Sequence, residues 1–222
     1  MIKYIKEGFK GTQAAIDPLK YFRDSGVVKK NDNQGQVNVK EFEDINVFAK
    51  TVDLEKSSVK VSNIALLEPI IMEYSKRKGL PSPEVVITFQ EDEESKPVFY
   101  TIKIEGLPGS DIEPDTENYN IALSLAEKLK REYRSQGIIR EMHLKDMIFQ
   151  TDDKGEIVGV IPTDFERVKI DYKNFDFETF SECAKELGNW SEEQLKNMKN
   201  KFETLKKEQE ENENRREGSI RE

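Results

Sequence analysis

Apolar residues recur along the chain at two spacings, and these predict both strands and helices. Alternating apolar and polar positions predict strands within residues 36–61, ending in the short run SVKVS, and a hairpin over 84–105 whose loop is the acidic run EDEES. Helices are predicted over 63–79 and over 118–136, each followed or ended by a glycine. We therefore expect an α+β fold with a small, mostly antiparallel sheet and flanking helices.

The stretch IIREMHLKDMIFQTDDKGEIVGVIPTDFERV, residues 138–168, admits two interpretations. It could be a catalytic loop followed by a metal-binding aspartate, or a β-hairpin with a polar turn. The order MIFQT, DDKG, EIVGVI is typical of two strands joined by a turn with glycine in the left-handed position. We favour the hairpin, and RVKIDY could add a third strand.

The first 35 residues predict an extended N-terminal arm. Their helical signal is DPLKYFRDSG, with Asp17 as the N-cap and Pro18 in the first turn. Leu19 and Phe22 share one face of this turn, and no nearby segment would cover them. We expect this arm to dock on the main domain or on another chain.

Two helices are predicted at the C-terminal end, the first within DFETFSECAKELG. The second opens with a capping box, in which Ser191 caps the helix and Gln194 returns the hydrogen bond. Its apolar positions then step by three, four and three residues, as in a short coiled-coil seam, and a charged tail follows. The seam residues are Leu195, Met198, Phe202 and Leu205. The chain thus divides into an arm (1–35), an α+β body (36–188) and a C-terminal helix with its tail (189–222).

Composition and charge narrow the classes of function. Hydrophobic and charged residues each make up 36% of the 222 residues, which is a polar balance for one domain and favours burial against a partner. The formal net charge of −9 makes direct nucleic-acid binding unlikely. No signal-peptide pattern or membrane-length apolar run is present. We expect a soluble protein that is intracellular, in the cytoplasm or inside a particle assembled there, and not secreted by a signal peptide.

Candidate chemistry is sparse. A single histidine, His143, and a single cysteine, Cys183, leave no closed set of zinc ligands and predict no disulfide within the chain. TDDKGE lacks the spacing of a calcium loop, and neither glycine-rich phosphate-binding motif occurs. From these patterns we expect no catalytic residue, no cofactor and no metal, and the protein is more readily interpreted as a non-enzyme.

One resemblance points in another direction. The segment GLPSPEVVITFQEDEESKPVFYTIKIEGLPGS (79–110), the helix over 118–136 and DDKGEIVGVIPTDFERV resemble, in order, parts of aminoglycoside-phosphotransferase-like kinases, and they cover about half of the chain. The resemblance implies that Lys50 is a phosphate-binding lysine, that Glu68 or Glu73 is its helix partner, and that Asp164 is a metal-binding aspartate.

The same resemblance has departures in the catalytic loop. When IIREMHLKDMIF is aligned on its two isoleucines, Arg140 replaces the histidine, Met142 the catalytic base and Met147 the asparagine that holds a second magnesium. A glycine-rich loop is also missing from the first 50 residues. The resemblance therefore implies a degenerate kinase-like domain that binds a nucleotide or a protein without efficient phosphoryl transfer.

Two hypotheses follow from the sequence. The first is a non-enzymatic, structural interaction protein, a subunit of a multi-protein assembly or a self-associating oligomer. Its predicted partner contacts are Leu19, Phe22, Leu195, Met198, Phe202 and Leu205. The second is the degenerate kinase-like domain.

Overall fold

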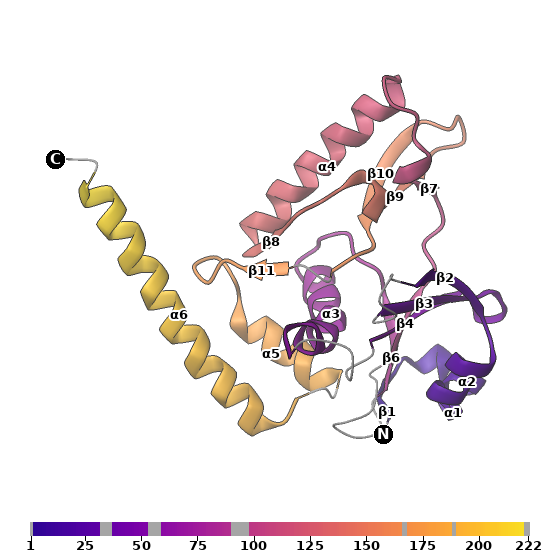
Figure 1. The fold of residues 1–222 in the computed structure, drawn as a ribbon, viewed down its shortest axis with the longest axis horizontal. Helices are drawn as coiled ribbons and strands as arrows, with labels where there is room; N and C mark the ends of the chain where they lie inside the picture. The colour runs from indigo at the N-terminus through magenta and orange to yellow at the C-terminus, as the bar shows by residue number, and fades with distance from the viewer. Residues whose placement is uncertain are drawn as a thin grey trace.

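A six-stranded antiparallel sheet dominates the N-terminal half of the chain (Figure 1). The computed structural model describes residues 2–31, 37–52, 59–89, 98–165, 168–187 and 190–219. The sheet has the order β1-β5-β6-β4-β3-β2. Its strands are β1 (Ile2–Ile5), β2 (Val27–Asn31), β3 (Val37–Phe42), β4 (Val47–Val52), β5 (Val85–Phe89) and β6 (Val98–Ile102). The predicted α+β fold is confirmed, and so is the β5–β6 hairpin; the acidic run EDEES lies outside the described residues.

The segment predicted as an arm supplies both edge strands of this sheet. β1 pairs with β5 at one edge, and β2 pairs with β3 at the other. Between them lie the 3-10 helix η1 (Glu7–Phe9) and two short helices, α1 (Gln13–Ile16) and α2 (Pro18–Asp24). Asp17 caps α2 by accepting from the Lys20 amide at 3.0 Å, as the sequence predicts. The arm docks on the main body through residues distant in sequence, which local patterns do not indicate.

Helix α3 (Val59–Arg77) crosses from the sheet to the second half of the molecule. The prediction of a strand at SVKVS is wrong for residues 59–62, which form the first turn of α3. Two valines in alternation are too short a pattern to outweigh the helical run that follows them. Pro69 lies inside α3 and is buried.

The second half of the molecule is built around α4 (Glu117–Ser135) and small sheets. β7 (Leu107–Pro108), β9 (Met147–Thr151) and β10 (Ile157–Pro162) form one sheet, and β8 (Ile138–Arg140) pairs with β11 (Val168–Ile170). β9 and β10 form the predicted hairpin, with Gly155 at φ +79° in its turn. The segment RVKIDY does supply a strand, but that strand joins β8 and not the hairpin.

Helices α5 (Phe177–Glu186) and α6 (Glu192–Ser219) complete the chain, and α6 reaches outward toward the C-terminus (Figure 1). The predicted capping box is present, because the Gln194 amide donates to the Ser191 hydroxyl and the Ser191 amide donates to Gln194. Both predicted domain boundaries, after residue 35 and after residue 188, fall outside the described residues. The three-part division therefore stays a prediction.

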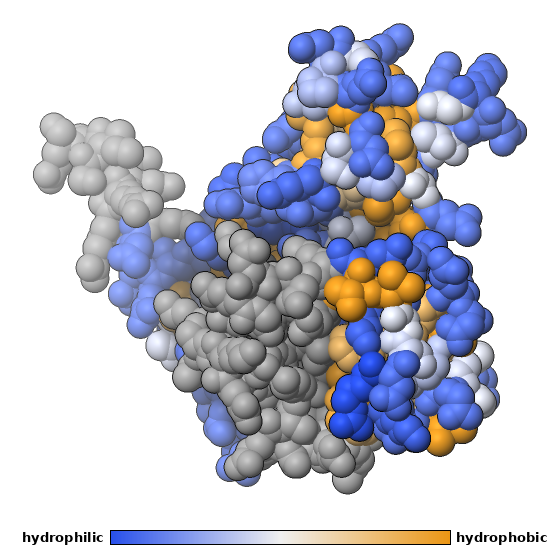
Figure 2. All heavy atoms as spheres, turned by 45° about the vertical axis from the view of Figure 1, so that its right-hand side comes forward, coloured by the Kyte–Doolittle hydropathy of each residue, from blue (hydrophilic) through white to orange (hydrophobic). Residues whose placement is uncertain are grey.

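Buried apolar residues form two clusters. One lies between the six-stranded sheet and α1 and α2, and includes Phe22, Phe42 and Tyr100. The other lies among α3, α4, α5 and α6 with the smaller sheets, and also takes in Val85 of β5 and Phe99 of β6. Figure 2 shows one face of the molecule, on which hydrophilic atoms alternate with narrower apolar areas.

Candidate functional site

A cavity of about 280 Å³ lies between the six-stranded sheet and the second half of the molecule. Its walls come from β3, β4 and β6, from α3, and from the segments around η4 (Leu144–Asp146) and after β10. Apolar side chains form most of the lining, and polar or charged side chains form the rest. The apolar lining includes Val39, Phe48, Ala49, Met72, Phe99, Ile102, Ile104 and Ile148; the polar lining includes Lys50, Glu68, Lys145, Asp146, Thr163 and Asp164.

A buried ion pair joins two walls of this cavity. The ammonium of Lys50 on β4 lies 2.8 Å from one carboxylate oxygen of Glu68 on α3 and donates to the other at 3.1 Å. The Lys50 side chain is 12% exposed and the Glu68 side chain 1%. Of the two helix partners that the sequence leaves open, Glu68 makes this pair, while Glu73 lies one turn further along α3 and contacts Arg77 at 3.5 Å.

Glu68 also positions the segment that follows β10. Its carboxylate accepts a hydrogen bond from the backbone amide of Phe165 at 3.2 Å, and this bond is buried. Phe165 itself is buried, and the residue before it, Asp164, lines the cavity. One carboxylate thus connects the Lys50 ammonium to the Asp164–Phe165 backbone.

Asp146 also lines the cavity; the sequence alignment set it aside because a frame that uses it as the base loses the spacing to any asparagine. Its carbonyl oxygen accepts from both the amide of Thr163, at 2.9 Å, and the Thr163 hydroxyl, at 3.0 Å. This tie holds the end of η4 beside the segment that carries Asp164, and both aspartates line the cavity. Two carboxylates are consequently available from neighbouring segments.

The sequence alignment on Ile138 and Ile139 set Met147 at the position of the metal-binding asparagine. Met147, which it placed there, is 1% exposed in the core, whereas its neighbour Asp146 lines the cavity. Shifting the frame by one residue also places Glu141, directly after β8, five positions before Asp146. That is the separation between catalytic aspartate and asparagine in kinase catalytic loops, and it was the signal available in the sequence.

Close packing of backbone fixes η4. The 3-10 helix η3 (Gly109–Asp111) lies so near that a Cβ built on Gly109 would collide with the carbonyl oxygen of Leu144. Only glycine fits this approach without displacement. Gly109 therefore helps to set the place of the segment that ends in Asp146.

A buried arginine lies behind the two aspartates. Arg140 on β8 is 6% exposed, and its guanidinium stands 4.6 Å from the centre of the Phe165 ring, in cation–π geometry. Its Nη1 has no hydrogen-bond partner among the described residues. Burial lowers the pKa of Arg140, while nearby carboxylates, including those of Asp164, Glu68 and Asp146, act in the opposite direction.

The two reactive side chain types found in the sequence lie elsewhere. His143 precedes η4, is exposed and does not line the cavity. Cys183 is buried on α5, and burial raises the pKa of its thiol to about 12, which disfavours the nucleophilic thiolate. Among the described residues, no group of three or more histidine, cysteine or acidic side chains has metal-binding geometry.

The six residues predicted to contact a partner lie on α2 and α6. Phe22 is buried against the Phe42 ring, and Leu195 and Phe202 are buried in the second core cluster. Leu19, Met198 and Leu205 are partly exposed. A partner-contact role for these residues stays a prediction.

Comparisons with known proteins identify the fold and no family. No protein-family profile matches the sequence, and no curated protein matches it. Among solved structures, the chain is similar to WaaP in its complex with acyl carrier protein, with 14% identity and a TM-score of 0.50, over 82% of this chain and 78% of that one. It is also similar to the Rio2 kinase of Chaetomium thermophilum, solved as an ADP, Mg²⁺ and phosphoaspartate complex, with 14% identity and a TM-score of 0.47.

The fold of this chain is similar to that of WaaP. The chain spans 84% of its own length in the Rio2 comparison but 64% of the Rio2 chain. At this level of identity the likeness extends to the fold alone. Separately, no helix among the described residues has the length and apolar character needed to cross a membrane.

Proposed function

We propose that the cavity between the sheet and the second half of the molecule binds a nucleoside triphosphate together with a divalent cation. The observation that carries the proposal is the buried Lys50–Glu68 ion pair, which has Asp146 and Asp164 in the same cavity lining. In protein kinases a lysine held by a helix glutamate contacts the nucleotide phosphates, and two side chains from the catalytic loop and the following hairpin hold the metal ions.

Each part of a nucleotide has a matching part of the cavity. The apolar side chains from β3, β4, β6 and α3 suit a flat base, and the Lys50 ammonium suits a phosphate oxygen. Two carboxylates fit Mg²⁺, which proteins usually hold through one or two carboxylates with the remaining ligands from phosphates and water. The residues therefore fit the cofactor, although the sequence alone led to the expectation of none.

The test is a thermal unfolding series with ATP and Mg²⁺. We expect the melting temperature of the parent protein to rise with ATP·Mg²⁺, and the rise to disappear in Asp164→Asn. Asp153→Asn is the matched control. It removes the same charge as Asp164→Asn, but Asp153 is exposed in the β9–β10 turn, away from the cavity. A parent protein that shows no shift at millimolar ATP·Mg²⁺, or an Asp164→Asn protein that shifts as much as the parent, would contradict the proposal.

Phosphoryl transfer is a second candidate function, favoured by the position of Glu141. This carboxylate is exposed directly after β8 and precedes Asp146 by five positions, the spacing at which kinases carry the base that accepts the substrate's hydroxyl proton. Glu141 and Asp146 are therefore our candidates for the base and the second metal ligand that the alignment on Ile138 and Ile139 does not supply.

Radiolabelled ATP distinguishes transfer from binding alone. We expect the parent protein to release or transfer γ-phosphate slowly, and Glu141→Gln to lose this activity by at least tenfold while it still binds ATP·Mg²⁺. A parent protein that binds ATP·Mg²⁺ but shows no turnover would rule out phosphoryl transfer and leave nucleotide binding as the proposed function.

The assembly-subunit hypothesis stays a prediction. WaaP was solved with a protein partner, which supports only the general expectation of a protein partner.

A further inference from the structure

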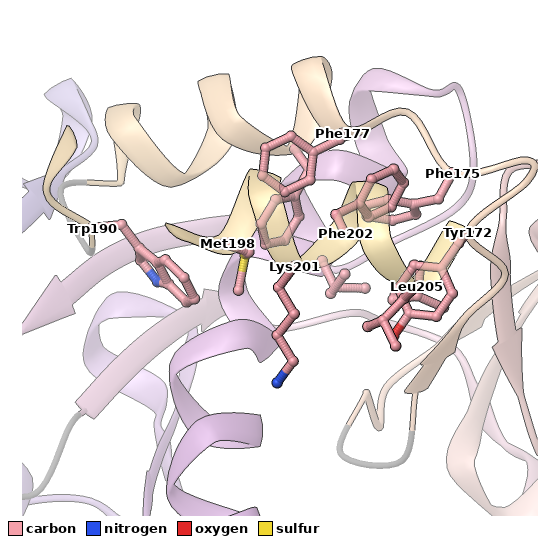
Figure 3. A pocket seen from close by; sticks show the side chains of 11 residues that line it. Tyr172, Phe175, Phe177, Trp190, Met198, Lys201, Phe202 and Leu205 are labelled. Atoms are coloured by element: carbon pink, nitrogen blue, oxygen red, sulfur yellow. The ribbon is translucent and has the colours of Figure 1, made fainter. Parts of the chain in front are cut away.

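A second cavity, of about 350 Å³, lies under helix α6 (Figure 3). It is enclosed by α6 on one side and by α5, β11, α3 and the segment between β11 and α5 on the others. It shares no residue with the candidate nucleotide cavity. Its lining is apolar apart from one lysine: Ile71, Ile170, Tyr172, Phe175, Phe177, Phe180, Trp190, Met198, Lys201, Phe202 and Leu205.

Aromatic rings form the walls of this cavity. The Phe202 ring lies 5.1 Å from that of Phe177 and 5.4 Å from that of Tyr172, centre to centre, and Trp190 meets Phe180 edge to face at 6.4 Å. Apolar cavities of roughly 150 Å³ stay dry and accept benzene-sized molecules, and ligand sites begin near 300 Å³. This cavity is therefore large enough for a small ligand and poorly suited to water.

Helix α6 is attached to the rest of the molecule on both sides of the cavity. Near its start, Glu192 pairs with Lys185 of α5 at 2.9 Å. Beyond the cavity, Gln209 accepts from the Tyr172 amide at 3.2 Å and donates to the Asp171 carboxylate at 2.8 Å. Between these two attachments Leu195 and Phe202 are buried, but Met198 and Leu205 remain partly exposed to the cavity.

Lys201 supplies a charge in the cavity lining. It is exposed, and its ammonium makes no hydrogen bond or ion pair with the described residues. In Figure 3 its aliphatic stem starts at α6 near Met198, and its ammonium lies away from the Phe177 and Phe202 rings. An apolar body with one cation at its edge complements a molecule with the reverse arrangement, an apolar tail and one anionic head.

We propose that this cavity binds a small amphiphilic monoanion, with its apolar tail among the rings and its carboxylate on Lys201. A nucleotide does not suit it, because the lining offers one cation and no carboxylate for a metal ion. A partner helix does not suit it either, because α6 of this chain itself forms one wall of the cavity. The site is independent of the nucleotide cavity and of any activity there.

Decanoate is the probe, and Trp190 is the reporter. Trp190 is the only tryptophan in the sequence and lines the cavity, so ligand entry changes its fluorescence directly. We expect a saturable change with decanoate and about tenfold weaker binding of decanol, which has the same tail and no charge. Equal affinity for decanoate and decanol, or no saturable change at millimolar decanoate, would overturn the proposal.

Two variants locate the ligand. Lys201→Gln should reduce decanoate affinity to that of decanol, whereas Lys199→Gln, an exposed position on the same helix outside this cavity, should leave it unchanged. Leu205→Phe should fill the cavity and weaken both probes, measured by isothermal titration calorimetry. If Lys201→Gln binds decanoate as tightly as the parent protein, the assignment of the carboxylate to Lys201 is wrong. This comparison does not depend on whether Leu205→Phe folds.

Discussion

At the scale of single residues, Glu68 connects segments that are distant in the sequence. Its carboxylate faces the Lys50 ammonium and also accepts from the Phe165 amide, so it joins β4, α3 and the segment carrying Asp164. Taking two charges out of water is unfavourable, and removing one partner of such a pair leaves the other buried without a counter-charge. Losing the charge on Glu68 should therefore lower the free energy of unfolding more than losing an exposed contact does.

Glu68→Gln tests this. The substitution keeps the shape and an acceptor for the Phe165 amide, but it leaves Lys50 without its counter-ion. We expect the free energy of unfolding to fall by about 3 kcal/mol, measured by urea denaturation. Glu73→Gln, on the same helix and with a longer contact to Arg77, should change it by less than about 1 kcal/mol. Similar losses in the two variants would contradict the central role of Glu68.

Arg140 gives a second prediction at this scale. Its buried cation acts on the carboxylates of Asp146 and Asp164, and this opposes the arrival of a divalent ion between them. We expect Arg140→Met to raise the affinity for Mg²⁺ in the absence of nucleotide several-fold, measured by calorimetry, and Arg140→Lys to leave it nearly unchanged. Arg131→Met, an exposed position on α4, is the control for net charge. An unaltered Mg²⁺ affinity in Arg140→Met would show that the guanidinium does not act on the aspartates.

At the scale of elements, caps determine where helices begin, and one cap depends on pH. Asp176 accepts from the Glu178 and Thr179 amides at the start of α5, and it lies 2.6 Å from the Lys78 ammonium. The Lys78 contact and the hydrogen bonds from Thr179 lower the pKa of Asp176 to about 2. An unfolded aspartate has a pKa of about 3.9, so the folded state favours the ionised form.

Asp176→Ala should therefore lower stability in a pH-dependent way. Because the folded pKa is depressed, the contribution is complete above about pH 4 and is lost as the pH falls toward about 2. We expect a loss of about 1 kcal/mol at pH 7, since Asp176 is partly exposed and solvent weakens its ion pair. The difference between the melting temperatures of the two proteins should narrow as the pH falls from 7 to 3. A difference in melting temperature that does not change with pH would mean that the hydrogen bonds of the cap, and not its charge, stabilise the protein.

The contact between η3 and η4 yields a prediction about backbone packing. A side chain at Gly109 would push against the carbonyl of Leu144, two residues before Asp146. Gly109→Ala should lower stability by about 2 kcal/mol and weaken ATP·Mg²⁺ binding, measured by denaturation and thermal shift. Gly155→Ala is the comparison: it lies in an open turn at positive φ, so it should affect stability but not nucleotide binding.

The elements that the sequence predicts well are those fixed by neighbouring residues. The Asp17 cap, the Ser191–Gln194 box and the β9–β10 turn depend on side chains within a few positions of each other, and all three are confirmed. Contacts across the chain are different, because no local pattern encodes that β1 reaches β5 or that Lys50 meets Glu68. The resemblance proposed Lys50 and Asp164, but an alignment anchored on two isoleucines set the neighbouring Met147, and not Asp146, in the asparagine position.

At the scale of the whole molecule, two core clusters meet across a shared cavity. The Lys50–Glu68 pair and the hydrogen bond from the Thr88 hydroxyl to the Leu187 carbonyl cross from one half to the other. A nucleotide bound in the cavity would add contacts to both halves. The six-stranded sheet also supplies Val85 and Phe99 to the second cluster. We expect β3 and β4, which supply none of the buried residues of that cluster, to lose structure separately from α5 and α6.

Phe202→Ala tests the independence of the two clusters. Phe202 on α6 is 7% exposed and its ring contacts those of Tyr172, Phe175 and Phe177, so its removal should destabilise the second cluster by about 3–5 kcal/mol. We expect hydrogen exchange to accelerate in α5, α6 and β11 and to stay unchanged in β3 and β4. Leu123→Ala, at an exposed position on α4, is the control. Equal acceleration in both sets of elements would mean that the two clusters unfold as a single cooperative unit, joined more strongly by α3 than the contacts around Glu68 imply.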